Sequence, residues 1–157
     1  RFTSDAFDRV DAQVAALAAG DDVAALDTDG WVSQQWVHFV RSLPLEPPVL
    51  AAVDARFGFT TRGHIEIAPG WMVAVIASGY VWEAPAVDQA LADFLTRHGR
   101  ALYIRRVYER LAASERGLAR AREIYAIARP TYHAVSQTVV DRIVGKPEEE
   151  GAACASD

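Results

Sequence analysis

Apolar side chains recur along much of this chain at the three- and four-residue spacing of amphipathic helices. The most apolar stretch, residues 64–80, is apolar on two sides and contains no lysine or arginine. Such a helix is packed by neighbours on several faces, so we predict it as the central helix of the fold. A buried β-strand is the competing interpretation, because residues 71–76 are rich in β-forming residues. The stretch is too short and too interrupted to span a membrane.

Pro69 and Gly70 interrupt this central segment. A proline beyond the first turn removes a backbone hydrogen bond and kinks a helix. The regular helix is therefore expected either to begin near Ala68 or to bend at that point.

Further helices are predicted on both sides of the central one. Their expected start and stop residues are Ser4, Gly20, Thr28 or Asp29, Gly58, Gly99 and Ser114 or Glu115. Pro47 and Pro48 suit the first turn of a helix, where missing N–H groups matter little. Pro130 is expected to lead the last helix, with Val135 facing inward.

Successive helices joined by only a few residues run antiparallel to their neighbours. A row of such hairpins predicts an all-α fold, a two-layer right-handed helical coil of armadillo or HEAT type. No exact sequence repeat is visible, so this prediction rests on helix lengths and connections. We expect one helical domain over residues 1–145 and a polar, disordered tail over residues 146–157.

Charge and cysteine content narrow the function classes only slightly. The net charge of −5 gives no overall case for nucleic acid or an acidic membrane. Arginines are nonetheless concentrated between Arg97 and Arg129, where solvated helix faces are the simplest interpretation. The single cysteine, Cys154, excludes a disulfide framework. No signal peptide is visible, and the chain, which begins without methionine, is expected to be excised from a longer one.

No catalytic motif is present in the sequence. Its histidines form no H-E-x-x-H pair, and there is no Cys/His cluster with zinc spacing. A G-x-S-x-G elbow, a P-loop and a G-x-G-x-x-G motif are also missing. By itself the sequence predicts a helical module without a self-contained active site, a cofactor or a metal.

An ordered series of short motifs carries a family resemblance. The series is Leu43-Pro44-Leu45, Phe57-Gly58-Phe59-Thr60, Glu66-Ile67, Trp71, Trp82-Glu83, Gly99-Arg100, Pro130 and His133. In this order and spacing the motifs resemble the C-terminal domain of leukotriene A4 hydrolase and its bacterial relatives among the zinc aminopeptidases. The resemblance spans residues 2–144.

The resemblance implies a domain of an enzyme whose zinc lies elsewhere. In that family an upstream catalytic domain holds zinc in an H-E-x-x-H motif, and the C-terminal helical coil closes one side of the substrate cleft. The coil lends basic residues that bind the free carboxylate of a peptide or fatty-acid substrate. Arg100 and Arg105 match family arginines, whereas Leu102 stands at the position of a lysine and Arg106 at that of a proline. The implied partners are the upstream domain of the same chain and its peptide substrate.

Two other functions stay open at this stage. A free-standing helical-repeat scaffold would bind a protein partner on its concave face. Nucleic-acid binding through the arginine-rich third is the weaker alternative, because the basic residues lack interleaved exposed aromatics. We therefore expect neither a nucleic acid nor a membrane as partner.

Overall fold

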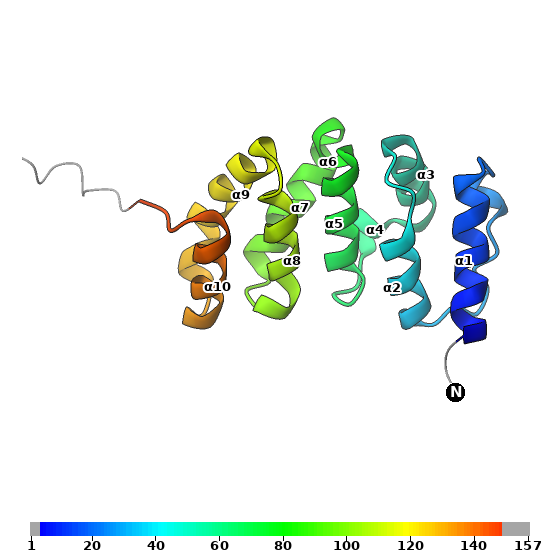
Figure 1. Ribbon diagram of the computed structural model, residues 1–157, viewed down its shortest axis with the longest axis horizontal. Coiled ribbons are helices and arrows are strands. Elements are labelled where there is room, and N and C mark those ends of the chain that lie inside the picture. Colours follow the sequence, from blue (N-terminus) through cyan, green and yellow to red (C-terminus); the bar gives the residue numbers. More distant parts are fainter. Residues whose placement is uncertain (1–3, 149–157) are drawn as a thin grey trace, which may run out of the picture. The chain divides into compact units, whose positions relative to one another are not determined.

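The computed structural model describes residues 4–148, and within that range the secondary structure is entirely helical. This range contains ten α-helices, which Figure 1 labels, and two 3₁₀-helices, and no strand occurs there. The all-α prediction is confirmed, and the strand alternative for residues 71–76 is wrong. In chain order the elements are α1 (Ser4–Ala18), η1 (Val23–Ala25), α2 (Ser33–Ser42), α3 (Pro47–Phe57), α4 (Phe59–Arg62), α5 (Ala68–Ser78), α6 (Tyr80–Glu83), α7 (Pro85–Arg97), α8 (Ala101–Leu111), α9 (Glu115–Ala128), η2 (Arg129–Thr131) and α10 (Ala134–Val144).

The chain forms two compact units that divide within α7, after Leu91. The described part of unit 1 is residues 4–91, and that of unit 2 is residues 92–148. The armadillo-like coil and the single domain over residues 1–145 stay predictions. Most of the predicted tail, residues 146–157, lies outside the described residues.

In unit 1 the helix α5 is central, as the sequence predicts. It packs against α2, α3, α4 and α6, and its Trp71 and Val75 are completely buried. The regular helix begins at Ala68, so Pro69 falls in the first turn, where its missing N–H leaves no broken hydrogen bond. Gly79 ends the helix with φ at 81°, a left-handed conformation that side chains rarely adopt.

One predicted detail of unit 1 is wrong. The cap of α2 is not Thr28 or Asp29, because the helix begins only at Ser33, after Val32. Gln35 supplies the missing polar contact: its Oε1 accepts from the Val32 N–H at 3.0 Å, and its Nε2 donates to the Ala6 carbonyl at 3.1 Å. The side chain is buried and ties α1 to α2.

Unit 2 packs α8 against both α9 and α10. Ser114 caps α9, as predicted, because its Oγ accepts from the Gly117 N–H at 3.0 Å. The last helix starts at Ala134 rather than near Pro130, which belongs to the separate turn η2. Val135 is 73% exposed, so its predicted inward position is wrong, and Ser136, Val140 and Val144 form the buried stripe instead.

Candidate functional site

Arg100 lies immediately before the first residue of α8, at the N-cap position. Its backbone is extended, with φ −82° and ψ 127°, and its carbonyl accepts from the Tyr103 and Ile104 N–H groups at 2.9 and 3.2 Å. The side chain is exposed to solvent. The first N–H groups of a helix have no acceptor within the helix, so they favour an anion at this end. The sequence-predicted arginine therefore stands at a helix start, as expected.

One aromatic ring contacts the Arg100 side chain, and two more rings follow behind it. Its guanidinium carbon lies 5.6 Å from the centre of the Tyr103 ring. The Tyr103 ring meets the edge of His98 at 6.4 Å, and His98 in turn lies 5.0 Å from Phe94. Phe94 is buried, so this row of rings extends from the core of unit 2 to the exposed arginine.

The backbone just before Arg100 is held by Tyr132. A Cβ built on Gly99 would lie only 3.0 Å from Cδ1 of Tyr132, closer than nearly all real contacts. The Tyr132 hydroxyl donates to the Leu95 carbonyl, so the hydroxyl of Tyr108, 2.9 Å away, must donate to Tyr132. Burial raises the pKa of Tyr132 to about 12, and both hydroxyls therefore stay protonated at neutral pH.

Arg105 does not share the surroundings of Arg100. Its Nε donates to Oε1 of Glu109 at 2.9 Å, and the pair is exposed on the outer face of α8. Five helical positions correspond to a rotation of about 140° and a rise of roughly 7.5 Å, so the two arginines point in different directions. Leu102, at the position where the resemblance places a lysine, is 74% exposed.

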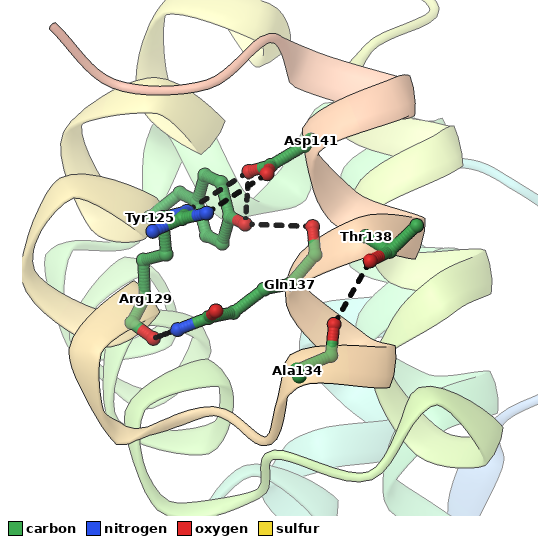
Figure 2. A network of polar contacts seen from close by, with 6 residues as sticks. All are labelled: Tyr125, Arg129, Ala134, Gln137, Thr138 and Asp141. Atoms are coloured by element: carbon green, nitrogen blue, oxygen red, sulfur yellow. Dashed lines mark hydrogen bonds and ion pairs between the residues drawn. The ribbon is translucent and has the colours of Figure 1, made fainter.

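A second polar cluster of unit 2 escaped the sequence analysis. Figure 2 shows the side chains of Tyr125, Arg129 and Asp141 converging between α9 and α10. Arg129 donates to both oxygens of Asp141, at 3.0 and 2.9 Å, and the Tyr125 hydroxyl donates to the same carboxylate at 2.5 Å. The amide of Gln137 donates to the Arg129 carbonyl at 2.9 Å, which completes the link. This cluster joins two helices, and both oxygens of the carboxylate accept hydrogen bonds within it.

The electrostatics of this cluster follow from its partners. Bonding to Arg129 lowers the pKa of Asp141, although partial burial acts in the opposite direction. Burial, followed by the Asp141 carboxylate, raises the pKa of Tyr125. The only sequence signal was the four-residue spacing of Tyr125 and Arg129 on one helix face, which is too common to identify a cluster.

The Phe57-Gly58-Phe59-Thr60 motif is structural. Gly58 ends α3 with φ at 68°, and both the N–H and the hydroxyl of Thr60 donate to Asp54, at 2.9 and 2.6 Å. The Thr60 hydroxyl oxygen accepts from the indole N–H of Trp71 at 3.0 Å. The motif therefore fixes α4 against the central helix α5.

The described residues offer no metal site and no membrane span. No group of three or more His, Cys, Asp or Glu side chains in residues 4–148 is placed to hold a metal ion. Over the same range no helix has the length and apolar character needed to cross a bilayer. The zinc that the resemblance implies belongs to an upstream catalytic domain and not to the residues described here.

Comparison with protein families gives a match over most of the chain. Residues 31–144 match the family model described as "Leukotriene A4 hydrolase, C-terminal". The matched range begins two residues before α2 and ends with α10, so it includes Arg100, Arg105 and the whole described part of unit 2 up to Val144.

Proposed function

Since this chain belongs to the leukotriene A4 hydrolase C-terminal family, we propose that it is the non-catalytic helical domain of a zinc aminopeptidase of that kind. The domain closes one side of the substrate cleft of its upstream catalytic domain, which holds the zinc. It also helps to recognise the free carboxylate of the peptide substrate. The observation that carries this proposal is the exposed Arg100 at the N-terminus of α8.

Arg100 has the chemistry that carboxylate recognition needs. A guanidinium holds a carboxylate with two parallel, charge-assisted hydrogen bonds, and the helix N-terminus favours the same anion. No ion pair engages Arg100 among residues 4–148, so its donors are available. Arg105 is a second candidate for binding the substrate. To do so, it would first have to break its hydrogen bond with Glu109.

Exposed apolar side chains at the same end of unit 2 support the proposal that a neighbouring domain covers this surface. Gly99 meets Tyr132, so the start of α8 lies beside the start of α10 and the end of α9. The large exposed side chains at this end are Leu102, Ile127 and Val135, each more than 70% exposed. A contiguous exposed apolar patch is typical of a surface that a neighbouring domain covers, and on this proposal the upstream domain covers these three side chains.

The experiment compares matched peptides on the full-length enzyme. Arg100→Ala is expected to lower kcat/KM for short peptides with a free C-terminal carboxylate by roughly ten- to a hundredfold, since losing such a bond costs about 1.5 to 3 kcal/mol. Amidated versions of the same peptides should barely change. Arg110→Ala, an exposed arginine in the last turn of α8, is the matched control. Equal slowing of acid and amide peptides by Arg100→Ala would refute the assignment.

Leu102 gives a test in the opposite direction. Restoring the cation with Leu102→Lys should raise the preference for acid over amide peptides, because a second positive charge would stand two residues from Arg100.

An H-E-x-x-H motif encoded upstream in the gene would support the peptidase. Its absence would instead support a free-standing helical scaffold.

A further inference from the structure

We propose that Tyr103 is the positioning residue for Arg100: its ring holds the guanidinium, so that a substrate carboxylate meets an arginine that is already oriented. This inference rests on the proposed role of Arg100 and adds a residue through which that role is exerted. It concerns selectivity between acidic and neutral C-termini.

The contact between the two side chains has the geometry of a cation–π interaction. The guanidinium carbon of Arg100 lies 5.6 Å from the Tyr103 ring centre, within the limit of about 6 Å for such contacts. An exposed arginine without an ion pair would otherwise sample many rotamers, and binding a carboxylate would have to restrict them. A ring that restricts them beforehand lowers the entropy that binding loses.

Tyr103 is itself fixed from the core. Its ring meets His98 edge-on, at 6.4 Å and 72°, and His98 packs on the buried Phe94. The Tyr103 hydroxyl makes no hydrogen bond to any residue of the described range. The ring, and not the hydroxyl, therefore provides the contact.

The backbone of Arg100 is fixed as well. Gly99 packs against the Tyr132 ring so closely that a side chain at position 99 would have to displace it. Tyr132 cannot shift without breaking its hydrogen bonds to Leu95 and Tyr108. With the backbone held by Tyr132 and the guanidinium held by Tyr103, Arg100 has one favoured direction.

Orientation of this kind acts on binding more than on chemistry. The carboxylate lies away from the bond that is cleaved, so Arg100 holds it equally in the ground state and the transition state. Loss of uniform binding raises KM and leaves kcat unchanged. Tyr103 should therefore act on the KM of acid peptides alone.

The test compares Tyr103→Leu with Tyr103→Phe in the full-length enzyme. Tyr103→Leu removes the ring and is expected to raise KM about two- to fivefold for acid peptides, the range of an exposed cation–π contact. The KM of the amidated peptides and every kcat should stay unchanged. Tyr103→Phe keeps the ring and should behave like the original enzyme, which is the rescue that distinguishes positioning from a role of the hydroxyl.

Two controls separate positioning from general loss of structure. Tyr125→Phe removes a buried hydroxyl that bonds Asp141, so it should lower the melting temperature without changing the acid-to-amide ratio. In an Arg100→Ala background, Tyr103→Leu should no longer alter that ratio, because the two residues act through one interaction.

The outcomes distinguish this inference from the proposed function. An acid-selective rise in KM with Tyr103→Leu, absent with Tyr103→Phe, supports it. If Arg100→Ala is acid-selective but Tyr103→Leu leaves the ratio unchanged or slows both peptides equally, the positioning role is refuted and carboxylate recognition by Arg100 stands. If Arg100→Ala itself shows no selectivity, both are refuted.

Discussion

Arg100, the proposed site residue, differs from Asp141 in how far its polar atoms are engaged by other residues. Both are charged and both belong to unit 2, but every oxygen of Asp141 is engaged by Arg129 and Tyr125. Arg100 lies over an aromatic ring, has no ion pair within residues 4–148 and is exposed to solvent. A charged group whose donors are unused is available to a ligand, whereas one whose partners are complete contributes to stability.

Asp141 should therefore affect unfolding rather than substrate recognition. Asp141→Asn is expected to lower the free energy of unfolding at pH 7 by about 1 to 2 kcal/mol, a value kept low because the side chain is partly exposed. Urea denaturation checks this, and Glu109→Gln, which removes an exposed carboxylate from α8, is the control expected to change little.

The same aspartate gives a pH dependence with a definite sign. Arg129 lowers the pKa of Asp141 below its ordinary value of about 3.9, so the native state favours the ionised form. The stabilisation is complete above that ordinary value and is lost as the pH falls through the lower, native-state pKa. The difference between the original chain and Asp141→Asn should thus be constant from pH 7 to about 5 and shrink below about 4. A difference that grows on acidification would contradict the assignment.

Residue-level prediction from sequence succeeded where a signal is local. Ser114 or Glu115 was predicted to start α9; the helix begins at Glu115 and Ser114 caps it, because a cap bonds a backbone group only three residues away. Tyr132 and Gly99 are in contact although they lie 33 residues apart in the sequence, and the hydrophobic pattern of the chain does not predict such a contact. Arg100 was proposed through the family resemblance, and its contact with the Tyr103 ring was not predicted.

Among the elements, α9 depends on a glycine in its first turn. A Cβ built on Gly117 would lie 2.1 Å from the Leu111 carbonyl oxygen and 2.9 Å from Oγ of Ser114. The last turn of α8 therefore approaches α9 through a position that only glycine can fill. This close approach explains why three residues suffice to connect the two helices.

Gly117→Ala should destabilise the protein although alanine is the better helix former. Propensity favours alanine by about 1 kcal/mol, but the clash involves backbone that cannot move aside, and overpacking costs about 1 to 3 kcal/mol. We expect a net loss, measured by thermal or urea unfolding. Ala119→Gly, at an exposed position of the same helix, isolates the propensity effect and should lose about 1 kcal/mol. An increase in stability with Gly117→Ala would show that the packing of α8 against α9 is not as described.

At the level of elements, hydrophobic periodicity located the long helices but missed the short ones. The helices α4 and α6 have four residues each. This is about one helical turn, too short for a hydrophobic period to be recognised. Their sequence signal is the glycine before each, Gly58 and Gly79, whose positive φ turns the chain between helices. The stripe of α10 was misplaced because Val135 and Ser136 exchange the exposure that their polarity suggests.

For the whole molecule, membership of the family suggests an enzyme function that the described helices alone do not indicate. The described helices supply a core in each unit and one exposed arginine beside an aromatic ring, but no group of side chains within residues 4–148 that could bind a metal. In the proposed enzyme the zinc chemistry belongs to the upstream catalytic domain. An all-α fold is compatible with many functions, so the fold alone could not have led to this proposal.

If the upstream domain holds the zinc and this chain only helps to bind the substrate, the chain by itself is expected to be inactive. The purified 157-residue chain should bind no stoichiometric zinc and release no product from aminoacyl substrates, because three protein ligands and an open position are what catalytic zinc requires. Metal analysis after dialysis, together with an aminopeptidase assay, measures both. The full-length enzyme serves as the positive control, since its upstream domain is proposed to hold the metal. One zinc per chain with turnover would mean that residues 1–157 contain an active site, and the division proposed here would be wrong.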